Sequence, residues 1–249
     1  MEDIKNISIL GSTSWGITLS NILVKNVDNV TILTRDLNEE KRINDERLIK
    51  RGKIYKLDNK IKISSNYEKI IEESQIIILA VPSISIKKNI GRINKFLTIE
   101  KIVISAIKGL EQESKKTISQ YLFDNTKLKQ NNIGVISGPN ISSEIYDGLP
   151  ATTVIGIHKK NEEKIRKMFN SDKFRAYSSN DIIGIEVGGI LKNIFAIGAG
   201  IIQEYKLGTN SMAAYITRSL NEMKNIITFF IASNVILFEL NIKYRKEAL

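Results

Sequence analysis

Short apolar runs alternate with more polar stretches along the chain as far as residue 178. The runs that have the length of a strand are residues 4–10, 30–33, 61–64, 76–81, 101–106, 133–136 and 152–157. Between them, apolar residues recur at helical spacing, in residues 15–24, 67–73, 84–96, 117–123, 142–146 and 162–169. A run that is apolar at every position, such as 76–81, is typical of a parallel strand covered on both faces. The alternation predicts an α/β fold with a Rossmann-like, doubly wound sheet.

The pattern changes near residue 178. Residues 182–200 contain the stretch VGGILKNIFAIGAG, which predicts a tightly packed helix whose glycines permit close helix contact, and residues 209–223 predict a second helix. We therefore predict two domains, residues 1–178 and a shortened all-helical domain over residues 179–249. Residues 226–240 are apolar but shorter than the roughly 20 residues of a membrane span. A buried helix or strand is the favoured interpretation, and no membrane span is predicted.

The amino-acid composition limits the kinds of site and partner that the chain can have. The chain has no cysteine and a single histidine, His158, at the end of a predicted strand. The absence of cysteine excludes disulfides and thiolate metal sites. A single histidine disfavours a Ser-His-Asp triad. We predict no metal site. The net charge of +10 favours anionic partners. It is spread over short pairs without interleaved aromatics, so no nucleic-acid site is predicted. The N-terminus lacks the pattern of a signal peptide, which predicts a cytoplasmic protein.

A glycine-containing turn follows the first predicted strand and opens a helix. It reads Gly11-Ser-Thr-Ser-Trp-Gly16, which is the context of a dinucleotide fingerprint, where a helix N-terminus receives the pyrophosphate. Thr13 stands where that fingerprint has its middle glycine. We expect its side chain to push the pyrophosphate outward or to weaken binding.

The second predicted strand ends at Thr34-Arg35-Asp36. At this position an acid holds the ribose 2′-hydroxyl of NAD, whereas an arginine suits the 2′-phosphate of NADP. Arg35 comes first, which favours NADP without excluding NAD. An ordinary charged turn is the alternative.

Further polar residues follow predicted strands or interrupt an apolar helix. Lys108 and the segment Ser137-Gly-Pro-Asn140 each stand beyond a strand end, where ligands bind in such sheets. Asn140 or Ser142 is a candidate cap for the next helix. Lys192 lies inside the glycine-rich helix, where burial lowers the pKa of a lysine and makes it a candidate proton carrier; a lysine that snorkels to the surface is the alternative.

These motifs together resemble the NAD(P)-dependent glycerol-3-phosphate dehydrogenase family, of the soluble bacterial type. The similar stretches, in family order, are GSTSWG, ILAVPS, SAIKGLE, ISGPNISSEIYDGLPATTV, IGIEVGGILKNIFAIGAG and GTNSMAAYITRSLNEM, and they span residues 4–223.

The resemblance implies a role for each matching residue. The implied cofactor-binding residues, for NADP or NAD, are Gly11, Ser14, Trp15, Gly16, Arg35, Lys108 and Ser142. The implied substrate-binding residues are Lys108, Gly138, Asn140 and Asn193. Lys192 matches the catalytic lysine, which would give or take the hydroxyl proton, while Lys108 adds positive charge. The implied reaction is the reversible reduction of dihydroxyacetone phosphate to sn-glycerol 3-phosphate, which feeds glycerophospholipid synthesis, and a homodimer is a candidate assembly.

The resemblance is interrupted after Met223. Residues 224–249 carry neither the Gly-Asp-Leu segment whose aspartate orients the catalytic lysine nor the Arg-Asn pair that grips the substrate phosphate. The sequence therefore predicts a truncated or frame-shifted C-terminus, with apolar helix faces left exposed. Three functions stay open: a working dehydrogenase, an inactive relative that binds NAD(P) without turnover, and a dinucleotide-binding regulatory module.

Overall fold

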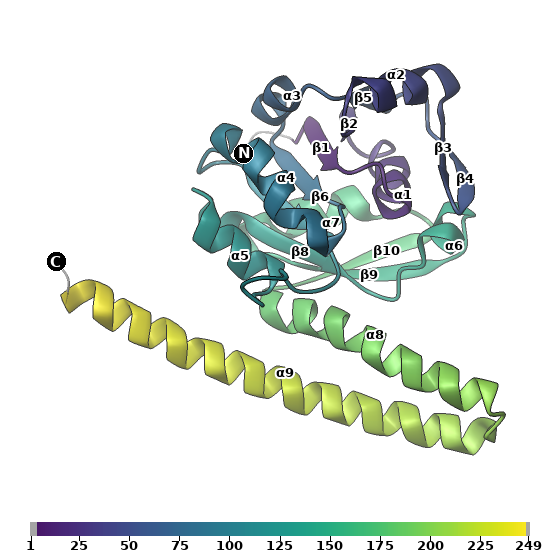
Figure 1. Cartoon of the computed structure of the whole chain (residues 1–249), viewed down its shortest axis with the longest axis vertical. Coiled ribbons are helices and arrows are strands. Elements are labelled where there is room, and N and C mark those ends of the chain that lie inside the picture. The colour runs from purple at the N-terminus through teal and green to yellow at the C-terminus, as the bar shows by residue number, and fades with distance from the viewer. Residues whose placement is uncertain (1–3, 248–249) are drawn as a thin grey trace. The chain divides into compact units, whose positions relative to one another are not determined.

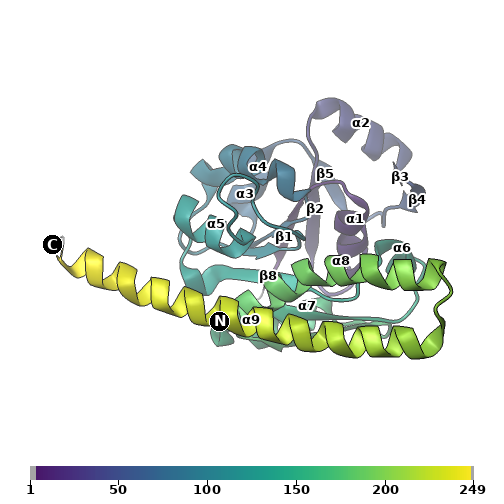
Figure 2. The same ribbon diagram turned by 60° about the horizontal axis from the view of Figure 1, so that its bottom comes forward.

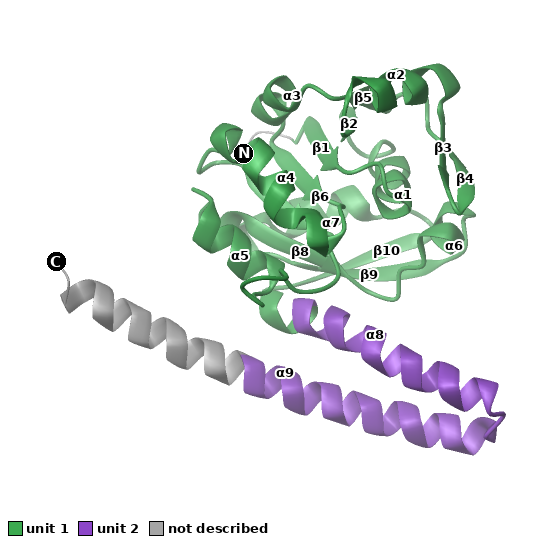
Figure 3. Ribbon diagram, in the orientation of Figure 1, with its two compact units in different colours: residues 1–185 green, residues 186–249 purple. Residues whose placement is uncertain are grey.

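The computed structural model describes the backbone of residues 4–247 and the side chains of residues 4–230. It divides into two compact units, Met1–Ile185 and Glu186–Leu249, which are coloured separately in Figure 3. The division falls later than residue 178. It does so because strand β10 (Phe174–Ser179) joins the sheet and the first turn of helix α8 (Ile182–Glu204) packs against the end of strand β9 (Ala151–Gly156). A Cβ built on Gly156 would lie 3.0 Å from Ile185 Cδ1.

The first unit is built around one eight-stranded sheet (Figure 1). Its strand order is β10-β9-β8-β7-β6-β1-β2-β5, and all neighbours are parallel except β8 and β9, which are antiparallel. The remaining strands are β1 (Asn6–Leu10), β2 (Asn29–Leu33), β5 (Lys62–Ser64), β6 (Ile76–Leu79), β7 (Ile102–Ser105) and β8 (Ile133–Ser137). The predicted Rossmann-like sheet is confirmed, with a mixed edge that the sequence pattern did not indicate.

Helices cover both faces of this sheet. Helix α1 (Ser14–Leu23) contacts α6 (Ser142–Tyr146) and α7 (Lys159–Phe169), and α3 (Tyr67–Glu73) contacts α4 (Ile86–Ile93). Helix α5 (Ile118–Asn125) packs on β8. Two apolar clusters result, and strand β6 contributes Ile76 and Ile78 to one, and Ile77 and Leu79 to the other. This alternation explains why its sequence is apolar throughout.

Four elements escaped the sequence prediction. Helix α2 (Leu37–Glu46) is strongly polar and buries only Glu39 and Ile43, so it lacks an apolar stripe. Strands β3 (Leu48–Arg51) and β4 (Lys53–Lys56) form an antiparallel hairpin that turns at Gly52, where φ is +72°. Strand β10 alternates buried and exposed residues in FRAYSS without a long apolar run.

The second unit pairs α8 with the long helix α9 (Gly208–Glu247), as Figure 2 shows. The Tyr215 hydroxyl donates to the carbonyl oxygen of Phe195 at 2.9 Å. A Cβ on Gly198 would lie 2.0 Å from that hydroxyl oxygen, so this glycine does permit close helix contact. Residues 226–240 are helical as part of α9, and the burial of most of them lies outside the described side chains. Several apolar side chains here are exposed: Ile194, Ile197, Ile201 and Leu220.

Helix α8 is long and apolar enough to cross a membrane when judged by length and composition alone. The core helix of a soluble protein passes the same test, so α8 is weak evidence for a membrane location.

Candidate functional site

Four strands end together at one edge of the sheet. Leu10 of β1 pairs with Leu79 of β6, Leu79 pairs with Ser105 of β7, and Ser105 pairs with Val135 of β8. The loops that leave these strands carry most of the residues singled out in the sequence. In open α/β sheets, ligands bind outside the carboxyl ends of the strands, so this edge is the candidate site.

In the turn after β1, the backbone at Gly11 approaches the backbone at Ala80 and at Gly16 very closely. Gly11 has φ +119°, and a Cβ there would lie 2.9 Å from the carbonyl oxygen of Ala80. A Cβ on Gly16 would lie 2.2 Å from the carbonyl oxygen of Gly11. Both positions therefore require glycine, as the first and last positions of a dinucleotide fingerprint do. Ser14 and Trp15 open helix α1, whose N-terminal N–H groups suit a pyrophosphate.

The side chain of Thr13 has a structural role in this turn. Its hydroxyl accepts a hydrogen bond from the backbone N–H of Gly16 at 3.1 Å, which caps α1, and donates one to the carbonyl oxygen of Ala80 at 2.7 Å. The hydroxyl is thus engaged by the turn and by the end of β6. Its effect on the position of a bound pyrophosphate stays a prediction.

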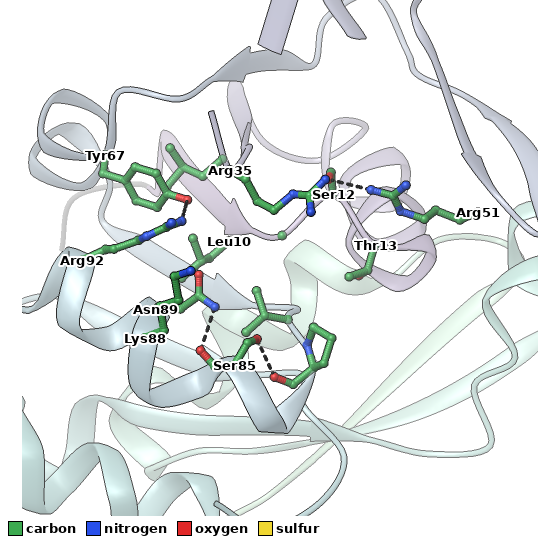
Figure 4. A pocket seen from close by; sticks show the side chains of 14 residues that line it. Leu10, Ser12, Thr13, Arg35, Arg51, Tyr67, Ser85, Lys88, Asn89 and Arg92 are labelled. Carbon is green, nitrogen blue, oxygen red and sulfur yellow. Dashed lines mark hydrogen bonds between the residues drawn. The ribbon is translucent and has the colours of Figure 1, made fainter. Parts of the chain in front are cut away.

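A cavity of about 370 Å³ opens on one side of this turn (Figure 4). Gly11, Ser12 and Thr13 line it together with the predicted residue Arg35. Its other polar lining residues are Arg51, Tyr67, Ser85, Lys88, Asn89 and Arg92. The cavity is rich in cations, which suits a phosphorylated ligand.

The acid next to Arg35 does not line this cavity. Asp36 caps helix α2, and its Oδ1 accepts the backbone N–H of Glu39 at 2.9 Å. Glu39 is the carboxylate that faces the fingerprint turn, since it accepts a hydrogen bond from the Ser12 hydroxyl at 2.8 Å. Burial opposes its ionisation, but hydrogen bonds from the backbone of Arg35 and from Ser12, together with the charge of Arg35, leave the pKa of Glu39 below its ordinary value.

A second cavity, of about 250 Å³, lies on the other side of the turn. Thr13, Trp15, Lys108, Asn140 and Ser142 line it. The structure thus brings together residues from the turn after β1, the loop after β7 and the loop after β8. Because Thr13, Val81 and Pro82 line both cavities, the fingerprint turn stands between two spaces, as an extended dinucleotide requires.

The loop after β8 is held by Asn140. Its side-chain nitrogen donates to the carbonyl oxygen of Thr152 at 2.8 Å, and its Oδ1 accepts from the Thr153 hydroxyl at 3.0 Å. Gly138 needs to be glycine, because a Cβ would lie 2.9 Å from the Thr152 carbonyl oxygen. The predicted helix cap is wrong: Ile141 is the N-cap of α6 and makes no side-chain cap bond, while Ser142 is the first helical residue.

The loop that carries Lys108 is ordered by an acid that the sequence reasoning left without a role. Glu111 accepts hydrogen bonds from the backbone N–H and the hydroxyl of Ser114, both at 2.7 Å. These bonds and the backbone N–H of Glu113 lower the pKa of Glu111 from 4.5 to about 2. The carboxylate therefore fixes the turn that follows Lys108 and Gly109.

Lys192 and Asn193 belong to the second unit. Both lie in the middle of α8, where Lys192 is half-buried and Asn193 is exposed. Within the described residues, no group of three or more His, Asp or Glu side chains is placed to hold a metal ion.

Glu39 and Arg51 are among the site residues that the sequence reasoning missed. Arg51 comes from the β3–β4 hairpin and donates to Glu39 Oε1 at 3.1 Å. No local signal distinguishes Glu39 from its neighbour Glu40 in the polar stretch NEEKR. The one available hint is that Glu39 stands three residues after a helix-capping aspartate.

Two models of one protein family match the chain. The N-terminus of NAD-dependent glycerol-3-phosphate dehydrogenase matches residues 6–163, and the C-terminus of the same family matches residues 181–242. The second match extends beyond Met223, into residues in which we had found no resemblance.

Curated relatives carry the name glycerol-3-phosphate dehydrogenase [NAD(P)+]. One from Fusobacterium nucleatum is 35% identical over 88% of this chain and 66% of its own length. One from Dehalococcoides mccartyi is 37% identical over 87% of this chain and 62% of its own length. The chain thus spans less than two thirds of the length of these relatives.

Solved structures give the same picture of the fold. A glycerol-3-phosphate dehydrogenase from Coxiella burnetii superposes with a TM-score of 0.80 at 25% identity, covering 91% of this chain and 70% of that one. One from Saccharomyces cerevisiae has a TM-score of 0.80 at 20% identity, covering 93% and 72%.

Proposed function

The chain belongs to the NAD-dependent glycerol-3-phosphate dehydrogenase family, and from this we propose that it reduces dihydroxyacetone phosphate to sn-glycerol 3-phosphate, reversibly, with NADP(H) or NAD(H). The observation that carries the proposal is the fingerprint turn between two cavities. Gly11 and Gly16 leave no room for a Cβ, and Thr13, the N-cap of α1, lines both cavities. These residues fit a dinucleotide.

The chain's own groups have distinct tasks in this reaction. A bound nicotinamide dinucleotide supplies the hydride that reaches C2 of the substrate. Lys192 donates a proton to the carbonyl oxygen as that oxygen gains negative charge, and takes it back in the reverse direction. Lys108 lines the cavity on the Trp15 side of the turn and adds positive charge beside the forming alkoxide.

The remaining site residues bind and orient. Ser14 and Trp15, at the start of α1, hold the cofactor with Arg35, while Ser142 adds a hydroxyl on the side of Lys108. Gly138, Asn140 and Asn193 are the proposed substrate contacts. Asn140 is held by the two threonines of β9 described above, so its main effect is to fix the loop in which Gly138 lies.

The setting of this activity follows from the same family. We propose a cytoplasmic protein that takes small phosphorylated substrates and supplies glycerophospholipid synthesis, with a homodimer as the candidate assembly. The spread positive charge of the surface suits anionic substrates.

The test is a turnover measurement on the purified 249-residue chain. NADPH or NADH is mixed with dihydroxyacetone phosphate, and the loss of reduced-nicotinamide absorbance is followed. Unphosphorylated dihydroxyacetone is the control substrate. Oxidation that depends on the phosphorylated substrate supports the proposal. Intact nucleotide binding without such oxidation would reduce the conclusion to a dinucleotide-binding protein.

A further inference from the structure

The hydroxyl of Thr153 is buried against the loop that joins β8 to α6, residues 138–141. Thr153 lies in β9 and is 1% exposed. Its hydroxyl has two acceptors, the carbonyl oxygen of Ser137 at 3.0 Å and Oδ1 of Asn140 at 3.0 Å. Because a hydroxyl carries a single proton, this proton is shared between the last residue of β8 and a side chain of the loop. Thr153 therefore connects the strand and the loop through one buried group.

The same strand fixes the amide of Asn140 in one orientation. Its Nδ2 donates to the carbonyl oxygen of Thr152 at 2.8 Å, and its Oδ1 faces the Thr153 hydroxyl. A rotated amide would bring Oδ1 against the Thr152 carbonyl, and two acceptors would meet without a proton between them. An amide nitrogen has two N–H groups, and no second hydrogen bond joins Nδ2 to the described residues. One N–H is thus available to a ligand, and Asn140 lines the cavity that Lys108 also lines.

The loop has no space in which to adjust if this amide moves. A Cβ on Gly138 would lie 2.9 Å from the Thr152 carbonyl oxygen, 3.0 Å from Asn140 Oδ1 and 3.1 Å from Thr153 Cα. The backbone at Gly138 is therefore packed against both the strand and the amide. Since Gly138 and Asn140 are both proposed substrate contacts, loss of the Thr153 hydroxyl would reach two contacts at once.

The other end of the loop is anchored independently. Thr18 of α1 is also 1% exposed. Its hydroxyl has the carbonyl oxygen of Ser14 at 2.9 Å and that of Ser142 at 3.1 Å as acceptors. This link does not involve β9, so a change at Thr153 leaves the junction with α6 in place. We therefore expect the effect of Thr153 to be confined to the part of the loop that carries Gly138 and Asn140.

Thr153 lines neither cavity of the site, so it can affect a ligand only through the loop. We propose that Thr153 is a positioning residue for the phosphorylated substrate. Its hydroxyl holds the Asn140 amide so that an N–H group, and not the carbonyl oxygen, is presented to an oxygen of the substrate. The oxygens of a phosphate or of a forming alkoxide require such donors. The inference rests on the proposed function and adds to it a residue that does not touch the ligand.

Steady-state kinetics, in which each substrate is varied separately, test this role. Thr153→Val replaces the hydroxyl by a methyl group of similar size, so the buried shape is kept. We expect KM for dihydroxyacetone phosphate to rise about three- to tenfold, as the loss of one neutral hydrogen bond would give, and KM for the reduced cofactor to stay within about twofold. A mere loss of folded protein would lower kcat and leave both KM values unchanged.

Two further variants control for the exchange itself. Thr153→Ser keeps the hydroxyl, so KM for dihydroxyacetone phosphate should stay within about twofold of the wild-type value. Thr152→Val is the matched control, because it makes the same exchange at the neighbouring exposed position, where the backbone carbonyl is the group that contacts Asn140. It should leave both KM values within about twofold.

A double-mutant cycle shows whether Thr153 acts through Asn140. Asn140→Ala alone should raise KM for dihydroxyacetone phosphate, and Thr153→Val added to it should raise KM by less than about a further twofold. Asn140→Ala changes only a loop side chain, so it tests the presented N–H even where Thr153→Val yields little folded chain. An unchanged KM for dihydroxyacetone phosphate in Asn140→Ala would overturn the proposal.

Other results would also overturn it: an equal rise of both KM values in Thr153→Val, a serine variant as impaired as the valine variant, or fully additive effects in the cycle. If the wild-type chain does not turn over, sn-glycerol 3-phosphate is titrated by calorimetry into the chain saturated with oxidised cofactor, and the same ratios are expected in Kd. A wild-type chain that neither turns over nor binds sn-glycerol 3-phosphate removes the proposed function and this role together. An active wild-type chain with an unaffected valine variant removes only the role of Thr153.

Discussion

The hydroxyl of Thr13 donates to the carbonyl oxygen of Ala80 at 2.7 Å, and the Thr13 hydroxyl oxygen accepts a hydrogen bond from the Gly16 N–H at 3.1 Å. One side chain therefore links the turn after β1, the start of α1 and the end of β6. A glycine at this position would leave the Ala80 carbonyl without that donor.

From this we expect Thr13→Gly, which restores the usual fingerprint, to make the chain less stable. The loss should be about 1–2 kcal/mol of unfolding free energy, since a partly buried acceptor is left unpaired and the cap of α1 is weakened. Urea unfolding measures it. Thr13→Ser keeps the hydroxyl and should stay close to the wild-type chain; a serine variant as unstable as the glycine variant would contradict the hydrogen-bond explanation.

Gly16→Ala should be destabilising and should impair nucleotide binding. The new methyl group would lie 2.2 Å from the Gly11 carbonyl oxygen, a backbone atom that cannot move without opening the turn. Strain of this kind costs about 1–3 kcal/mol. Gly91→Ala is the matched control, because nothing lies within 4 Å of its Cβ position in α4. It should stabilise the chain by about 0.5–1 kcal/mol, and a similar effect of the two substitutions would refute the close-approach argument.

If the chain is a working dehydrogenase, Lys192→Ala should lower kcat by about 10²–10⁴-fold, the usual contribution of a general acid or base. Binding of adenosine 2′,5′-bisphosphate should be unchanged, since the proposed nucleotide contacts lie in the first unit. Lys224→Ala removes an exposed lysine from α9 and serves as the control. Undiminished turnover by the Lys192 variant would remove this residue from the mechanism.

The stability of the first unit should depend on pH through Glu111. Its pKa is about 2 in the folded chain, below the ordinary value of 4.5, because Ser114 and Glu113 donate to the ionised form. The carboxylate therefore stabilises the fold fully above about pH 4.5, and this contribution is lost as the pH falls toward 2.

Glu111→Gln should consequently be less stable than the wild-type chain at pH 6, and the difference should shrink as the pH falls from about 4.5 toward 2. Thermal unfolding across this range measures it. Glu100→Gln, at an exposed surface pair with Lys129, is the control. If the difference in stability between the variant and the wild-type chain stays constant with pH, the charge of Glu111 does not contribute to stability and only the shape of its side chain matters.

The sheet was predictable because its central strands are covered on both faces. Ile76, Ile77 and Ile78 alternate between the two apolar clusters, so each must be apolar, and the sequence displays this directly. Helix α2 offered no such signal, because its buried residues are one isoleucine and one glutamate.

The site was predictable where backbone geometry demands a residue type. Gly11 and Gly16 are required locally and could be recognised. Glu39 meets Ser12 from 27 positions away, and Arg51 approaches through a hairpin that the pattern did not predict. Contacts of that kind depend on tertiary folding and leave no periodic trace in the sequence.

The carboxylate of Glu39 also ties a peripheral hairpin to the fingerprint turn. Its Oε1 accepts from Arg51 of the hairpin and from the Ser12 hydroxyl of the turn. Strands β3 and β4 lie outside the eight-stranded sheet, yet Arg51 lines the same cavity as the turn. An insertion or deletion in this hairpin should therefore change the wall of that cavity, although it would leave the sheet untouched.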